Sequence, residues 1–157
     1  MPVFVQRLDC SWDPVWMVAR KVHYRRNQQM TIAPYRVRPT YEQAEAYKDN
    51  GDIRVTNVET GKEERIEVKG RNLNYAKRED FLFPTMYVDT PERVEKLGPA
   101  DAYYNVNRNL THAWVVKGET RPEWRLTEFF DNTRQRWSWT YGCPIELAEL
   151  VTLDPVG

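Results

Sequence analysis

The stretch DIRVTNVETGKEERIEVK, residues 52–69, contains two runs in which apolar and polar side chains alternate. Ile53 and Val55 take alternate positions in the first run, and Ile66 and Val68 do so in the second. A period of two is typical of strands that bury one face. Because a glycine-containing turn signal separates the runs, the stretch predicts a β-hairpin.

The apolar positions also predict how the two strands pair. Residues directly opposite each other in an antiparallel pair lie on the same face of the sheet, and a slip by one residue would bury charge. The expected register pairs Val55 with Ile66, Ile53 with Val68, Asp52 with Lys69 and Arg54 with Glu67. Asp52, Glu67 and Lys69 should then meet at one end of the opposite face.

These three side chains have the chemistry of a metal-dependent hydrolytic site. The carboxylates of Asp52 and Glu67, with the backbone carbonyl of Val68, are hard oxygen donors that suit Mg²⁺ or Mn²⁺. Such an ion activates water and stabilises charge on a phosphate. Lys69 would orient that water or neutralise charge in the transition state. Cross-strand ion pairs on a surface hairpin use the same residue types, so a structural interpretation remains open.

Further along the chain, capping signals and apolar runs predict a mixed β-sheet flanked by helices, an α/β (α+β) fold. A Thr-x-x-Gln box at Thr40 predicts a helix from Tyr41 to about Asp49. Thr90-Pro91 predicts the start of a second helix, which Gly98 should end. Strands are expected at Phe83–Val88, Ala102–Val106, His112–Val116, Trp124–Phe130 and Arg136–Tyr141, the last two as a C-terminal hairpin.

The motif made by Asp52, fourteen further residues and then Glu67-Val68-Lys69 resembles the Asp…(Asp/Glu)-x-Lys motif of the PD-(D/E)XK nuclease superfamily. The order of elements expected over residues 40–106 is similar to that family's restriction-endonuclease-like core. Gly51 stands where the family motif has proline. The resemblance implies Asp52 and Glu67 as metal ligands and Lys69 as the catalytic lysine. Many members add a carboxylate from the preceding helix, and Glu45 is the candidate.

The resemblance implies a metal-dependent nuclease that hydrolyses phosphodiester bonds with Mg²⁺ or Mn²⁺. DNA is the first expectation for the substrate, and members of the family often form homodimers to cut two strands. Formal net charge is zero, but basic residues gather locally. A polyanionic partner would explain these clusters, and so would a solvated face. Five of their members are candidates for phosphate contact: Arg25, Arg26, Arg71, Lys77 and Arg78.

Length and composition favour one domain over residues 1–157. We expect a nuclease-like core at about 40–117, with a basic N-terminal segment, 1–39, and an aromatic hairpin region, 118–157, packed onto it. No apolar run approaches the length of a membrane span, and no secretory signal is evident, so a cytoplasmic location is expected. Two cysteines without close spacing predict free thiols.

Two other functional classes remain open. A non-catalytic module could bind nucleic acid on the same fold, and a protein interaction domain could use the C-terminal hairpin. That hairpin is rich in aromatic residues, including Trp137 and Trp139. Aromatic side chains are mostly core-forming, but they also stack on unpaired bases. His23 and His112 lie far apart in the sequence, which makes a histidine-based zinc site a poor expectation.

Overall fold

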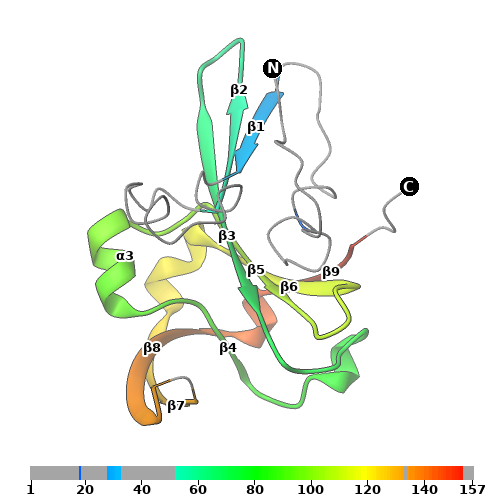
Figure 1. Cartoon of the computed structure of the whole chain (residues 1–157), viewed down its shortest axis with the longest axis vertical. Helices are drawn as coiled ribbons and strands as arrows, with labels where there is room; N and C mark the ends of the chain where they lie inside the picture. The colour runs from blue at the N-terminus through cyan, green and yellow to red at the C-terminus, as the bar shows by residue number, and fades with distance from the viewer. Residues whose placement is uncertain (1–17, 19–27, 33–51, 133, 154–157) are drawn as a thin grey trace.

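A computed structural model describes residues 18, 28–32, 52–132 and 134–153. Its architecture is mixed α+β and mostly β-sheet (Figure 1). The helix expected from Tyr41 to Asp49 lies outside the described residues, as do Glu45, Arg25, Arg26 and His23. Within the described residues, the structure contains no helix with the length and apolar character that crossing a membrane requires.

The main sheet has six strands in the order β1-β2-β3-β5-β6-β9. Neighbouring strands are antiparallel except β3 and β5, which are parallel. The strands are β1 (Gln28–Ile32), β2 (Ile53–Asn57), β3 (Glu63–Gly70), β5 (Ala102–Val106), β6 (His112–Lys117) and β9 (Glu149–Thr152). Strands β2, β3, β5 and β6 thus confirm four expected strands.

The β2–β3 hairpin forms, but the predicted register is wrong by two residues. The structure pairs Ile53 with Ile66, where the sequence predicted Val68. The turn explains the shift, because Asn57 Oδ1 accepts the backbone N–H groups of Glu59 and Thr60 at 3.0 and 3.1 Å. Gly61 follows with φ +72°, a conformation that favours glycine. An even shift keeps every side chain on its predicted face.

A second sheet has three strands in the order β4-β8-β7. These strands are β4 (Thr85–Tyr87), β7 (Arg125–Asp131) and β8 (Arg136–Pro144). The predicted C-terminal hairpin is confirmed by β7 and β8, which pair antiparallel. The expected strand at Phe83–Val88 is shorter than predicted and pairs with β8, so it belongs to the second sheet and not to the sheet of the first hairpin.

Helix α3 (Pro91–Leu97) lies in the crossover between β3 and β5. Its predicted boundaries are confirmed. Thr90 is the N-cap, and its hydroxyl accepts the N–H of Arg93 at 3.4 Å. Proline opens the helix, and Gly98 ends it with φ +74°.

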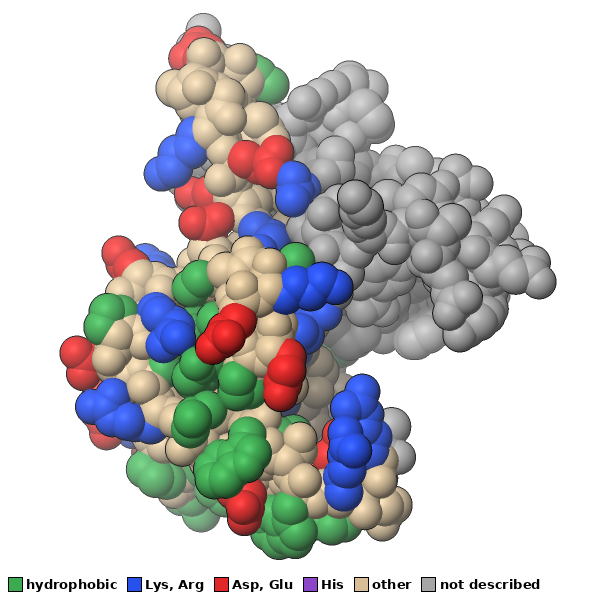
Figure 2. Space-filling model, turned by 90° about the vertical axis from the view of Figure 1, so that its left-hand side faces the viewer, with side chains coloured by type: hydrophobic (Ala, Val, Ile, Leu, Met, Phe, Trp, Pro, Cys, Tyr) green, Lys and Arg blue, Asp and Glu red, His purple; other side chains and the backbone are tan. Residues whose placement is uncertain are grey.

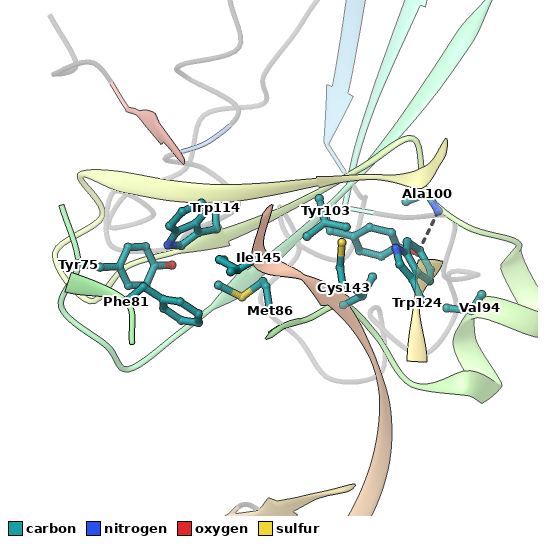
Figure 3. Close-up of a cluster of buried hydrophobic side chains, with 12 residues drawn as sticks. Tyr75, Phe81, Met86, Val94, Ala100, Tyr103, Trp114, Trp124, Cys143 and Ile145 are labelled. Carbon is teal, nitrogen blue, oxygen red and sulfur yellow. Dashed lines mark hydrogen bonds between the residues drawn. The ribbon is translucent and has the colours of Figure 1, made fainter. Parts of the chain in front are cut away.

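The two faces of the main sheet bury two different apolar clusters. Tyr103, Trp114 and Val116 lie on the face covered by the second sheet and α3, which contribute Met86, Cys143 and Val94 (Figure 3). The opposite face buries the alternating residues of the first hairpin together with Val106 and Ala113. The alternation therefore sends Asp52 and Glu67 toward the layer between the two sheets, where buried charge needs partners. Arg54 and Glu63, farther along the hairpin, are exposed.

Candidate active site

The predicted trio lies where β2 begins and β3 continues past it. Asp52 directly precedes β2, and the register brings it to the level of Glu67. Both carboxylates are buried. The Asp52 Oδ2 atom accepts the backbone N–H of Val68 at 2.8 Å. The side chain of Asp52 therefore accepts a hydrogen bond from β3 just beyond the part of β3 that pairs with β2. The donor, Val68, is the middle residue of the Glu-x-Lys motif.

Glu67 is held by two arginines. Its Oε1 atom lies 3.3 Å from a terminal nitrogen of Arg93 and 3.6 Å from Nε of Arg65. The terminal nitrogens of Arg65 also donate to the carbonyls of Leu97 and Gly98 at the end of α3, at 2.7 and 2.6 Å. Glu67 is 1% exposed, and a carboxylate at that depth requires such partners.

Lys69 points toward an acid that sequence reasoning missed. Its Nζ lies 3.1 Å from Oδ1 of Asp89, and the side chain is partly exposed. Asp89 is buried, and its second oxygen pairs with Nε of Arg93 at 3.2 Å. Arg93 therefore bridges Glu67 and Asp89. We refer to Asp52, Arg65, Glu67, Lys69, Asp89 and Arg93 as the charged cluster.

Asp89 is fixed by its position between a strand and a helix. It follows β4 and directly precedes the N-cap Thr90, whose N–H donates to Asp89 Oδ1 at 2.8 Å. Strand β8 holds its backbone, because the carbonyl of Asp89 accepts from Tyr141 N at 2.8 Å and from Thr140 Oγ1 at 3.0 Å. In the sequence, Asp89 was recognisable only as an acidic residue before a helix N-cap. That position does not indicate that Asp89 contacts Lys69.

Three of the predicted phosphate contacts can be located. Arg71 is half-buried, and its guanidinium donates to Asn105 Oδ1 and to the carbonyl of Tyr87, both at 3.0 Å. Burial lowers the pKa of Arg71. Arg78 lies over the Trp114 ring at 5.6 Å and donates to a backbone carbonyl at 3.3 Å. Lys77 is exposed beside it. Arg71 and Arg78 are thus already engaged in internal contacts.

The charged cluster offers part of the ligand set that Mg²⁺ requires. Two carboxylates on adjacent strands are oxygen ligands of the kind this ion takes, with waters completing its shell. Among the described residues, however, no group of three or more acidic, histidine or cysteine side chains is arranged to hold a metal. Glu67 is also neutralised by arginine. The donor chemistry fits the ion once Arg93 moves away from Glu67, because the terminal nitrogens of Arg65 are taken up by the carbonyls of Leu97 and Gly98.

Comparison of the chain with family models, curated proteins and solved structures found no match in any of the three. Any functional assignment therefore rests on the geometry of the charged cluster.

Proposed function

We propose that the protein is a metal-dependent nuclease that hydrolyses phosphodiester bonds, with DNA as the first expected substrate. The observation that carries the proposal is that two buried acids, Asp52 and Glu67, lie at the same level of adjoining strands, with Lys69 two residues beyond Glu67 on β3. The Asp52 carboxylate reaches the backbone between the other two residues. Two acids beside a lysine, on adjoining strands, are the groups that phosphodiester hydrolysis with a hard cation needs.

Each member of the trio has a defined part in this proposal. Asp52 and Glu67 would hold Mg²⁺ or Mn²⁺, with the carbonyl of Val68 as a further ligand. The bound ion supplies an activated water and charge stabilisation at phosphate. Lys69 would orient the attacking water and offset negative charge that grows on the phosphate. Asp89, 3.1 Å from the ammonium, is a positioning residue that holds Lys69 in place.

Arg93 would control access to Glu67 in this scheme. Its guanidinium brings one positive charge to Glu67 and Asp89, which opposes the approach of a second cation. The side chain is one-third exposed, at 34%, so it can rotate toward solvent without opening the core. A substrate phosphate is one acceptor that could receive this guanidinium, because arginine pairs well with phosphate oxygens.

Cleavage assays test the proposal most simply. The parent should cut plasmid or oligonucleotide DNA in Mg²⁺ or Mn²⁺, and Lys69→Ala should lower the rate by about 10²- to 10³-fold. Lys62→Ala is the matched control, because Lys62 is an exposed lysine in the hairpin turn, outside the charged cluster and the candidate phosphate contacts, and it should cut like the parent. Equal cleavage by Lys69→Ala and the parent would exclude the assigned role.

A specific observation favours a second candidate, a non-catalytic nucleic-acid-binding module. Glu67 and Asp89 are already paired with arginine and lysine, which is how a purely structural ion network would look. If the parent binds DNA but cuts no substrate in a panel of single-stranded, double-stranded and RNA molecules, this second function replaces the first.

A further inference from the structure

The β7–β8 hairpin exposes large apolar side chains on one face. Trp137 and Trp139 are 65% and 53% exposed, and Leu126 and Phe130 are also exposed. Figure 2 shows hydrophobic side chains gathered at the lower end of the molecule, where Figure 1 places β7 and β8. Single exposed apolar residues are ordinary, but contiguous groups mark interaction sites. We call these four residues the aromatic face.

The register shows that the aromatic face is continuous. Phe130 lies opposite Trp137, and Glu128 lies opposite Trp139. The rings of Phe130 and Trp137 meet edge to face with centroids 5.6 Å apart. Trp137 and Trp139 are two residues apart on one strand, so their side chains leave the sheet about 7 Å apart. That is roughly twice the ~3.4 Å rise between neighbouring bases along a nucleic-acid strand.

An arginine extends the aromatic face toward the body of the protein. Tyr141 lies opposite Leu126, on the same side of β8 as the two exposed tryptophans. The Arg121 guanidinium lies 4.4 Å from the Tyr141 ring centroid and donates to the phenol oxygen at 3.1 Å. Aromatic rings alternating with guanidinium groups are the surfaces on which unpaired bases stack.

The same strand leads directly to the charged cluster. Tyr141 N and Thr140 Oγ1 both donate to the carbonyl of Asp89, and Asp89 pairs with Lys69. Asp89 and Thr140 are buried, and Thr140 lies on the opposite face of β8 from Trp139, so these bonds connect β8 to the charged cluster through the interior of the protein.

The hairpin region contains one more arginine than acidic residues. Over residues 121–141 there are four arginines and three acids, Arg121, Arg125, Arg134 and Arg136 against Glu123, Glu128 and Asp131. A column of Lys and Arg side chains stands beside the hydrophobic group in Figure 2. The register puts Arg125 and Arg136 on the other face of the hairpin and Glu128 opposite Trp139 on the aromatic face, so the basic group placed on that face is Arg121 at Tyr141.

We propose that the aromatic face binds single-stranded nucleic acid, with Trp137 and Trp139 stacking on bases. The inference rests on the proposed function for the site that would cut the bound strand, but the binding itself requires no cleavage. It narrows the substrate of the nuclease to unpaired strands, overhangs or frayed ends.

The test is binding of a labelled 15-nucleotide oligo(dT) and of a 15-base-pair duplex, measured by fluorescence anisotropy in EDTA. The parent should bind the single strand more tightly than the duplex. Trp137→Ala with Trp139→Ala should weaken single-strand binding by at least about tenfold, since each stacked ring contributes substantially to affinity. Trp137→Phe with Trp139→Phe keeps rings and should lose much less. Leu82→Ala, at an exposed residue outside the hairpin, is the control and should bind like the parent.

Three outcomes would overturn the inference. These are no binding by the parent, equal binding of single strand and duplex, or unchanged binding by the alanine pair. Sedimentation of the same variants examines a protein partner: loss of a dimer in the alanine pair, with oligonucleotide binding unchanged, would assign the face to self-association. Because EDTA removes the metal, failure of cleavage leaves this result intact, and failure of binding leaves the cleavage result intact.

Discussion

The charged cluster and the aromatic face differ in what they bury and expose: the first buries charged side chains, and the second exposes apolar side chains to water. In the first, charged groups lie in the layer between two sheets, where Glu67 and Asp89 are buried and paired with Arg93. In the second, large rings lie in water, with Trp137 more than half exposed. Buried charge is tolerated only when partners are supplied within the fold. Exposed rings have no such internal compensation, so a partner from outside is the simpler expectation.

Because of this difference, we expect the charged cluster to contribute mainly to stability and the aromatic face mainly to binding. The arginine and lysine partners of Glu67 and Asp89 are internal, so these residues stabilise the native state and would have to exchange contacts for the proposed cation to bind. The aromatic face contributes little to the fold and is ready to bind without rearrangement. Substitutions in the two regions should therefore affect stability and binding in opposite proportions.

The largest difference should appear in stability. Glu67→Ala leaves Arg65 and Arg93 without their shared acid and should lower the free energy of unfolding by on the order of 3 kcal/mol, the lower end of the range for breaking a buried pair, because water screens the partly exposed Arg93. Trp137→Ala should stay within about 0.5 kcal/mol of the parent. Urea denaturation measures both. Similar losses in the two variants would remove the distinction between the regions.

A smaller effect is expected for metal affinity when Arg93 is replaced. Arg93→Met removes one positive charge beside Glu67 and keeps a long apolar side chain, so Mn²⁺ should bind about tenfold more tightly, equivalent to ~1.4 kcal/mol. Calorimetry on the protein without substrate provides the readout. Arg54→Met is the matched control, because Arg54 pairs with Glu63 at the exposed part of the hairpin. Weaker Mn²⁺ binding by Arg93→Met would mean that the guanidinium supports the site and does not compete for it.

Local signals in the sequence predicted the elements well. The N-cap at Thr90, the stop at Gly98 and the alternation in residues 52–69 each act within a few residues, and each is confirmed. The hairpin register was predicted wrongly because the Asn57 side chain accepts hydrogen bonds from the turn backbone, so the turn begins earlier in the sequence than the alternation of apolar residues indicated. The alternation of apolar and polar side chains cannot distinguish two registers that differ by an even number of residues, because both keep each side chain on the same face.

The partners of the site could not be predicted from such signals. Asp89 approaches Lys69 across 20 residues, and Arg93 approaches Glu67 across 26. These contacts depend on the parallel pairing of β3 with β5 and on the placement of β4 in the second sheet. Neither feature has a local signature, since a short strand such as Thr85–Tyr87 fits either sheet. The sequence suggested the trio because its members share one hairpin, but the expected pairing of Asp52 with Lys69 and of Arg54 with Glu67 is wrong: Arg54 pairs with Arg65, and Lys69 contacts Asp89.

The central claim, that Asp52 and Glu67 form a cation site, is tested most directly by Mn²⁺ titration followed through backbone amide NMR signals. The Val68 amide is the natural probe, because its N–H donates to Asp52. If the two carboxylates hold the ion, paramagnetic Mn²⁺ at millimolar concentration should broaden the signals of Glu67, Val68 and Lys69 first, and Asp52→Asn should abolish this effect. Signals that stay sharp in the parent, or broaden equally in Asp52→Asn, would contradict the claim.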